Sequence, residues 1–185
     1  MTYDTSIYLD KELQPRLKLI NVICTSPRKV ILDIENFMTT PNSVIMCADV
    51  TSLYPNIPIQ LGDLTVTKVL EELQYFTPSR LKFLMALLTW VLTENYCTFN
   101  NVTYHQLQGT AMGTPTAVTY ANLFLYGIEK ALILKHKPVY YKRYIDDVYS
   151  IFDNTITANN YIMDFNSIVP SITFEAVTIG RTGII

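Results

Sequence analysis

Apolar and polar positions follow two rhythms along this chain, one typical of helices and one typical of strands. Apolar residues recur every three or four positions from Arg28 to Met38, which predicts a helix. The apolar run from Val44 to Ala48 predicts a buried strand that ends at Asp49. The segment from Ser52 to Pro58 holds two prolines, which cannot pair regularly within a sheet, so a turn is predicted there.

The pattern becomes helical after this turn. A helix is predicted from about Gln60 to Tyr75, with leucines gathered on one side. Thr77 and Pro78 are a typical N-cap and first-turn pair, so a further helix is predicted from there to about Glu94.

In the second half of the chain, the pattern of apolar and polar residues predicts hairpins and helices. Two short alternating runs, 96–99 and 102–107, flank Asn100 and Asn101, a pair that favours a tight hairpin turn. The other expected elements are helices at 116–134 and 158–168, strands at 139–144, 148–152 and 171–178, and a turn at 180–183. Residues 1–17 show no clear period. This order predicts an α+β fold, with helices backing one antiparallel sheet.

Composition limits the class of protein without naming its function. The chain has 185 residues, of which 49% are hydrophobic and 16% charged, so we expect one globular domain. The net charge of −2 and the pI near 5.6 are unexpected for a protein that binds nucleic acid, where a basic surface is usual.

Three further features bear on location. Cys24, Cys47 and Cys97 fit no metal-ligand spacing and no disulfide framework, so we expect buried, reduced thiols in an intracellular protein. The N-terminus shows no signal peptide. The most apolar stretch, Phe83 to Leu92, is too short to cross a bilayer and predicts a core helix, so no membrane partner is expected.

Three aspartates lie at the ends of predicted strands. Asp146 and Asp147 lie between two strand-like segments, and Asp49 ends another. Turns accept Asp readily, so from these residues alone solvated turn carboxylates and a metal site carry similar weight. Three carboxylates at strand ends would suit two Mg²⁺ ions, which take oxygen ligands and leave positions open for substrate phosphates. The reaction that fits such a site is in-line displacement at phosphorus.

A glycine-containing segment, Gln108 to Pro115, precedes a predicted helix. Glycines there allow the backbone to approach a ligand closely. The segment lacks the Lys-Ser/Thr ending of the P-loop, so by itself it favours a plain connection.

Taken together, these segments resemble reverse transcriptases, and most closely those of Penelope-like retroelements. The resemblance runs from about residue 18 to the C-terminus, with the order and spacing of the motifs preserved. The matching segments are Ala48 to Pro58, Leu92 to Asn95 with Phe99-Asn100, Gln108 to Pro115 continuing to Tyr120–Phe124, Arg143 to Asp147, and Ile172 to Glu175.

The resemblance implies a reverse-transcriptase palm with two-metal catalysis. Asp49 and Asp146 would be the main ligands of two Mg²⁺ ions, with Mn²⁺ as an alternative. Asp147 would be a supporting carboxylate, and the backbone carbonyl of Val50 would complete one metal's shell.

The resemblance also implies substrate contacts. Tyr54 would be an aromatic gate that clashes with a 2′-hydroxyl, although a packing aromatic before a proline turn is a reasonable alternative. Gln108 would contact the incoming nucleotide, and Gly109 would let template and backbone approach. Tyr144 and Ile145 would pack under the primer end. The basic cluster with Lys142 and Arg143 could track a nucleic-acid backbone, or be a solvated edge.

On this interpretation the domain is partial. Residues 1–43 would be a remnant of the fingers with a connecting helix, 44–185 would be the palm, and the thumb would be absent. Arg16 or Lys18 would be the basic residue of the fingers. Basic nucleic-acid surface in the absent parts would account for the acidic pI.

The predicted activity is RNA-directed DNA polymerisation. The partners would be an RNA template, a DNA primer and dNTPs, in an intracellular and nuclear setting. The isolated chain need not be active, because binding and positioning require the absent parts. Two alternatives stay open: a group II intron-like or telomerase-like polymerase, and a non-catalytic remnant that only packs or binds nucleic acid.

Overall fold

A computed structural model describes residues 2–24, 26–35 and 37–181 of this protein. The chain forms two compact units. The helical unit consists of Met1–Leu19 and Ser52–Gly127, and the sheet unit consists of Ile20–Thr51 and Ile128–Ile185. The predicted division into 1–43 and 44–185 stays a prediction, because compactness alone assigns neither unit a role.

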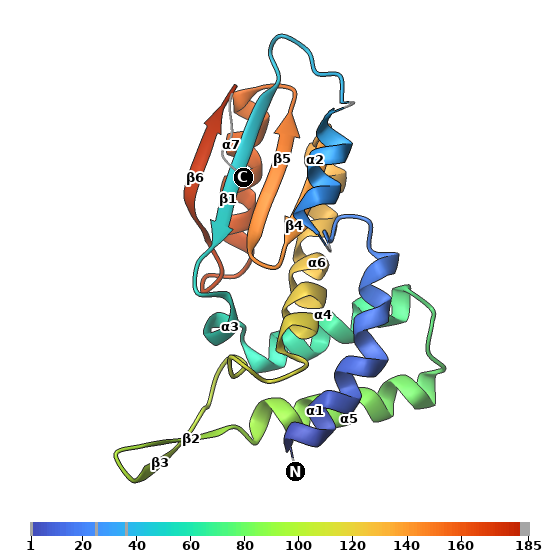
Figure 1. The fold of residues 1–185 in the computed structure, drawn as a ribbon, viewed down its shortest axis with the longest axis vertical. Coiled ribbons are helices and arrows are strands. Elements are labelled where there is room, and N and C mark those ends of the chain that lie inside the picture. The colour runs from blue at the N-terminus through green and yellow to red at the C-terminus, as the bar shows by residue number, and fades with distance from the viewer. Residues whose placement is uncertain (1, 25, 36, 182–185) are drawn as a thin grey trace. The chain divides into compact units, whose positions relative to one another are not determined.

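An antiparallel sheet is the centre of the sheet unit (Figure 1). Its four strands lie in the order β4-β5-β1-β6, and each neighbouring pair is antiparallel. Their bounds are β1 Val44–Val50, β4 Tyr140–Tyr144, β5 Asp147–Phe152 and β6 Phe174–Gly180. The predicted α+β layout with one antiparallel sheet is confirmed for these strands.

One face of the sheet is covered by α7 (Thr155–Ile168), which lies behind the strands in Figure 1. Alternate residues of β1, from Val44 to Val50, are buried, as expected for a strand with one face in a core. On α7, Phe165 stacks on Phe174 with ring centroids 3.9 Å apart, and Tyr161 lies against Phe152 at 5.5 Å. Helix and sheet therefore share one aromatic core.

The opposite face of the sheet is covered by α2 (Pro27–Glu35) over part of its length. Val30 of α2 and Cys24 form a hydrophobic cluster with Tyr149 and Ile151 of β5. These two β5 residues pair with Cys47 and Ile45 of β1, and so define the face that also carries Asp49. The turn predicted at 180–183 lies largely outside the described residues.

The helical unit is built from helices and one hairpin. The N-terminal segment, in which the sequence showed no clear period, is helical, and two hydrogen bonds link it to residues 116 and 119. The backbone N–H of Thr116 donates to Ser6 Oγ at 3.0 Å, and the Thr119 hydroxyl donates to Asp10 at 2.6 Å. The bounds are α1 Thr2–Leu13, a 3₁₀ segment Gln14–Leu19, α3 Leu53–Asn56, α4 Ile59–Glu72, α5 Pro78–Thr93 and α6 Ala117–His136, which continues into the sheet unit.

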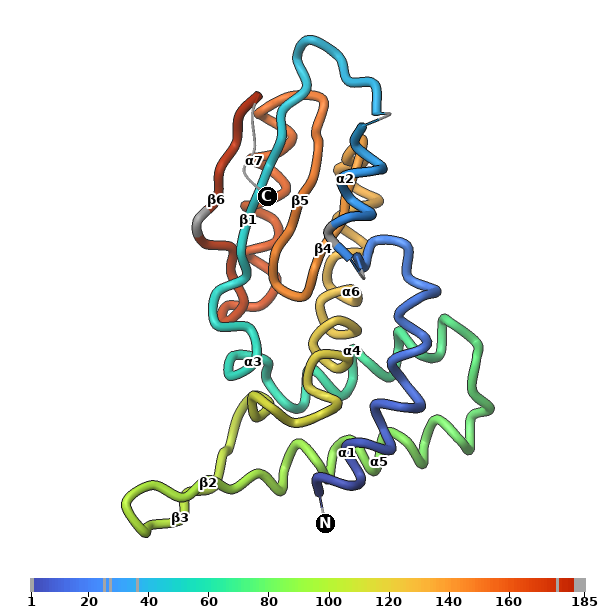
Figure 2. The backbone as a smooth tube through the Cα atoms, in the orientation of Figure 1, coloured from blue at the N-terminus to red at the C-terminus, as the bar shows by residue number. Residues whose placement is uncertain are grey.

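Two local sequence signals in the helical unit, a helix start and a hairpin turn, have the structures predicted for them. The Thr77 hydroxyl accepts from the backbone N–H of Arg80, and Pro78 occupies the first turn of α5. Asn100 and Asn101 both have positive φ, 50° and 61°, which suits a tight hairpin turn of the primed type. They join β2 (Tyr96–Phe99) to β3 (Val102–His105), an exposed hairpin that projects beyond the end of α5 (Figure 2).

All three cysteines are free thiols, but they are not all buried as predicted. Cys24 is buried and Cys47 half-buried, whereas Cys97 is exposed because both strands of its hairpin face solvent. Among the described residues, α6 is long and apolar enough to cross a membrane by length and composition. Most of its apolar window is buried inside the protein, which is typical of a core helix.

The close packing of α4 against α6 can be tested by a substitution at Gly62. A Cβ at Gly62 would lie 1.8 Å from the hydroxyl oxygen of Tyr120, whose side chain is fully buried. We expect Gly62→Ala to lower the free energy of unfolding by about 1–3 kcal/mol despite better helix propensity. Chemical denaturation measures this.

Tyr120→Phe is the matched background for that change. The Tyr120 hydroxyl is buried without a hydrogen-bond partner in the part of the chain that the structure describes, so its removal should cost little by itself. In the Tyr120→Phe protein, Gly62→Ala should be less destabilising because the nearest clashing atom is gone. A Gly62→Ala protein more stable than wild type would contradict this packing.

Candidate functional site

Three carboxylates lie in one row across the open end of the sheet. Asp49 on β1 pairs in register with Asp147 on β5 and with Glu175 on β6. Residues directly opposite one another in a sheet point to the same face. The pairing of β1 with β6 shifts register between Cys47 and Asp49, so an irregularity in the ladder lies next to this row.

A tight turn brings Asp146 to the same place. It lies between β4 and β5, and its backbone carbonyl accepts a hydrogen bond from the N–H of Val50 at 3.2 Å. Ile145, just before it, has a φ of 58°, in the left-handed region. Two segments far apart in the sequence thus meet at the end of β1, and the predicted residues Asp49, Asp146 and Asp147 come together with Val50.

The carboxylates act on one another electrostatically. Burial raises the pKa of Asp49, and the negative charges of Asp146, Asp147 and Glu175 raise it further, against a hydrogen bond from the Val50 N–H. Burial, followed by the charge of Asp146, likewise raises the pKa of Asp147. Like charges held this close favour either protonation or a bound cation.

The donor chemistry of this cluster fits a hard divalent cation, since all its side-chain donors are carboxylate oxygens. Among the described residues, no group of three or more His, Cys, Asp or Glu side chains is arranged so that it could hold a metal ion by itself. Mg²⁺ does not require one, because it is usually held by one or two carboxylates together with water and substrate phosphates.

Glu175 is a member of this cluster that the sequence did not single out as a site residue. It lies on β6, exposed, opposite Asp49. Its only sequence signal is that it ends the matching segment Ile172 to Glu175, whose proximity to Asp49 depends on strand pairing.

A second group of predicted residues assembles in the helical unit. The N–H of Gly109 donates to the Ile57 carbonyl at 3.1 Å, and the N–H of Thr110 donates to the Tyr54 carbonyl at 2.9 Å. Gly109 is buried with a φ of 74°, and a Cβ there would lie 2.5 Å from backbone atoms of Tyr54 and Pro55. The glycine segment therefore lies directly on the turn that carries Tyr54.

The side chains at this second position differ in exposure. Gln108 is exposed, so its side chain is accessible to a ligand, whereas Tyr54 is half-buried. Their proposed contacts with a nucleotide stay predictions.

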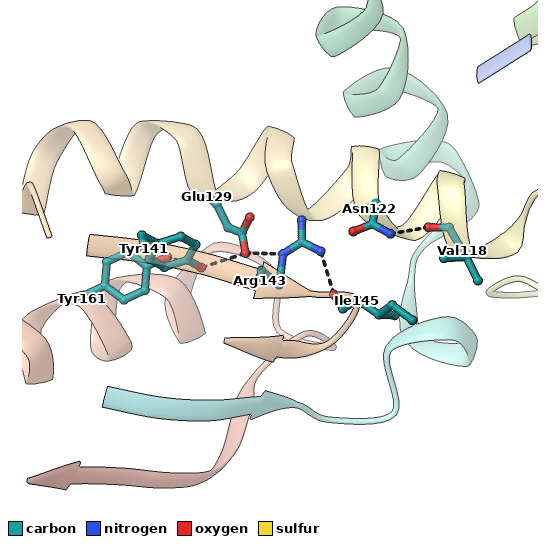
Figure 3. Close-up of polar contacts among 7 residues, drawn as sticks. All are labelled: Val118, Asn122, Glu129, Tyr141, Arg143, Ile145 and Tyr161. Atoms are coloured by element: carbon teal, nitrogen blue, oxygen red, sulfur yellow. Dashed lines mark hydrogen bonds and ion pairs between the residues drawn. The ribbon is translucent and has the colours of Figure 1, made fainter. Parts of the chain in front are cut away.

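The basic residues predicted to touch nucleic acid are mostly turned inward. The side chain of Arg143 is fully buried and forms an ion pair with Glu129 on α6 at 2.7 Å (Figure 3). Lys142 is also buried, its ammonium donates to Asn21, and burial and nearby Lys29 lower its pKa. Direct phosphate contacts from Arg143 or Lys142 are not supported by this geometry. Tyr144 is exposed and accessible.

Of the two candidates for a basic residue of the fingers, Lys18 is the accessible one. Its side chain is exposed, whereas the Arg16 guanidinium lies over the ring of Tyr75, 3.2 Å from its centroid. The Arg16 Nε is buried and has no hydrogen-bond partner within residues 2–24, 26–35 and 37–181. Arg16 is therefore held by cation–π packing within the helical unit.

The fold is similar to those of solved polymerases. Apo telomerase from Candida tropicalis, truncated from the C-terminal domain, shares 14% identity at a TM-score of 0.74 over 97% of this chain and 41% of that chain. Telomerase from Candida albicans with a fragment of telomeric RNA shares 10% identity at a TM-score of 0.64, over 99% of this chain and 34% of that chain. The RNA-dependent RNA polymerase of a human picobirnavirus, as an insertion-loop deletion mutant, shares 11% identity at a TM-score of 0.63, over 83% of this chain and 30% of that chain.

These likenesses establish the fold. It is a palm-like fold similar to that of these polymerases, an antiparallel sheet backed by helices, which confirms the predicted fold class. The chain spans between about a third and two fifths of the length of the telomerase structures it matches. No protein-family model and no curated protein matches the chain.

The two glycines of the 108–115 segment give a matched test of its packing. Both have positive φ, but a Cβ at Gly109 would meet backbone atoms at 2.5 Å, whereas a Cβ at Gly113 would meet none of the described residues within 4 Å. We expect Gly113→Ala to lower the free energy of unfolding by about 1–2 kcal/mol, the cost of a left-handed L-residue. Gly109→Ala should cost at least about 1 kcal/mol more, since backbone must also move. Equal costs in chemical denaturation would show that the segment does not lie on Tyr54 and Pro55.

Proposed function

We propose that this chain is the palm, with part of the fingers, of a Penelope-like reverse transcriptase. The reaction is RNA-directed addition of deoxynucleotides to a primer 3′-hydroxyl with release of pyrophosphate. The observation that carries this proposal is the meeting of Asp49, Asp146 and Asp147 at the open end of a polymerase-type sheet. The Penelope-like assignment rests on the segments Asn95 to Phe99 and Gln108 to Pro115.

The carboxylate cluster would hold two Mg²⁺ ions. Asp49 and Asp146 are the proposed main ligands, with Asp147 as support and the Val50 carbonyl completing one shell. Bound there, the ions would lower the pKa of the primer hydroxyl and stabilise charge on the transferring phosphate. The protein's own contribution is a set of carboxylates whose mutual repulsion favours binding of a cation.

The Gly109 segment and Tyr54 would serve nucleotide selection. The exposed Gln108 is the proposed contact for the incoming nucleotide, and the buried Gly109 keeps the segment close to the Tyr54 backbone. The Tyr54 ring would exclude a ribose 2′-hydroxyl and so favour deoxynucleotides. Tyr144 and Ile145 would support the primer end.

The proposed partners are an RNA template and a DNA primer, in the nucleus. Support comes from the Candida albicans telomerase, whose structure contains a fragment of telomeric RNA. The net charge of −2 on this chain means that most of the basic surface for nucleic acid would be supplied elsewhere in a longer protein.

A telomerase-like polymerase is the second candidate. It is favoured by the structural likeness to telomerases that extends over nearly all of this chain. A non-catalytic remnant is the alternative from another class, and it should show no metal dependence in nucleotide binding.

Removal of Asp146 tests the proposed chemistry. We expect the wild-type chain to bind dTTP only with Mg²⁺, and we expect any extension of oligo-dT on poly-rA to require Mg²⁺ as well. Asp146→Ala should lower the extension rate by about 10³-fold or more, because a main metal ligand is lost. Equilibrium dialysis and primer extension measure the two properties.

Asp153→Ala is the matched control, since Asp153 is an exposed carboxylate that follows β5. It should leave both properties unchanged. Metal-independent dTTP binding by the wild type would favour the non-catalytic remnant.

The Tyr54 gate has its own test. Tyr54→Val should raise the efficiency of ribonucleotide use relative to deoxynucleotide use by about 10–100-fold, because the side chain that excludes the 2′-hydroxyl is shortened. Steady-state kinetics with dTTP and UTP gives this ratio. A lower efficiency with both nucleotides at an unchanged ratio would mean that Tyr54 is a packing residue.

A further inference from the structure

A buried ion pair lies beside the turn that carries Asp146. Arg143 on β4 donates through its Nε to Glu129 Oε1 on α6 at 2.7 Å, and both side chains are fully buried. The Tyr141 hydroxyl donates to the same oxygen at 2.8 Å and accepts from the Tyr161 hydroxyl at 3.0 Å. Figure 3 shows these side chains gathered between α6, β4 and α7. The Arg143 side chain is therefore held against α6, in a hydrogen-bonded network that Tyr161 joins from α7.

The other end of the guanidinium reaches the turn itself. Arg143 Nη1 donates to the backbone carbonyl of Ile145 at 2.6 Å (Figure 3). Ile145 is β-branched and has a φ of 58°, a conformation that costs an L-residue about 1–2 kcal/mol. Such strain persists only where the surroundings impose it, and the hydrogen bond from Arg143 is one contact that does so.

Stability alone is a poor explanation for this ion pair. Taking both charges out of water offsets most of their attraction, and apolar replacements of buried pairs are often neutral or stabilising. Glu129 Oε2 is also buried without a hydrogen-bond partner among the described residues. Burial of an ion pair is therefore weak evidence for a role in stability. Because this pair also donates a hydrogen bond to the carbonyl of a strained residue, it is better explained by the conformation that it selects.

That conformation determines where the carboxylates point. Asp146 and Asp147 follow Ile145 directly, so a change of its φ would redirect both. Asp147 would leave its register with Asp49, and the Asp146 carbonyl would leave the Val50 N–H.

We propose that Arg143 is a positioning residue, which holds the left-handed turn at Ile145 so that Asp146 and Asp147 face a divalent cation together with Asp49. This inference rests on the proposed function for the cation site. On this inference Arg143 positions the turn, instead of contacting a phosphate as the sequence predicted.

A double-mutant cycle on Mn²⁺ affinity tests the proposal. Mn²⁺ alone is titrated into the full chain and free ion is followed by electron paramagnetic resonance. Arg143→Lys keeps the charge but loses the forked geometry, so it should weaken Mn²⁺ binding about tenfold, as loss of an outer-shell partner does. Asn adopts the left-handed conformation more readily than Ile, so in the Ile145→Asn background the same change should cost less than about threefold.

A purely structural ion pair would behave differently. Arg143→Lys would then lower the melting temperature without weakening Mn²⁺ binding by the folded protein, or would weaken it equally in both backgrounds. Either result overturns the proposal. If Arg143→Lys does not fold, Glu129→Gln with Arg143→Gln replaces it, because that pair leaves no unpaired buried charge. The same loss and the same rescue are expected.

Two further variants separate this inference from the proposed function. Arg80→Lys makes the same swap at an ion-paired arginine of the helical unit, 3.1 Å from Glu12, and should leave Mn²⁺ binding unchanged. Asp146→Asn should weaken it strongly. Loss with Asp146→Asn but not with Arg143→Lys overturns only the positioning role. Mn²⁺ binding that is absent, or indifferent to Asp146→Asn, overturns the cation site and the inference with it.

Discussion

The register of β1 between β5 and β6 is the constraint on which the candidate site depends. Side chains alternate between the faces of a strand, so a slip of one residue would place Asp49 in the core and the apolar Ala48 or Val50 at the open end. The buried residues Met46 and Val50 resist such a slip, because it would expose them to solvent. Hydrophobic burial on one face thus determines the position of the carboxylates on the other.

The turn at Ile145 and Asp146 is held in a different way. No hydrophobic pattern specifies it, since a left-handed isoleucine is unfavourable by itself. Its conformation is supported by polar contacts, from Arg143 to the Ile145 carbonyl and from the Val50 N–H to the Asp146 carbonyl. The site therefore combines a strand positioned by burial with a turn positioned by hydrogen bonds. Asp147 and Glu175 are exposed, so solvent reduces the charge repulsion among the carboxylates.

Much of the fold and the candidate site was predictable from local patterns. The Thr77-Pro78 start of α5, the Asn100-Asn101 hairpin and the strand ending at Asp49 depend on short-range backbone preferences or on hydrophobic period. The helix at Thr2–Leu13 was missed, because its period is weak and distant contacts such as Ser6 to Thr116 hold it. Exposure of Cys97 was missed because alternation in a hairpin does not reveal that neither face is covered.

Local sequence patterns are enough to indicate which residues end strands, where glycine and asparagine permit positive φ, and which segments resemble those of reverse transcriptases. The pairing of distant segments, by contrast, brings Glu175 to the carboxylates and buries Arg143 against Glu129. Strand pairing and the burial of a charge depend on partners distant in the chain, so local patterns do not reveal them. Whether a basic residue meets solvent or a carboxylate is not encoded by its neighbours in sequence.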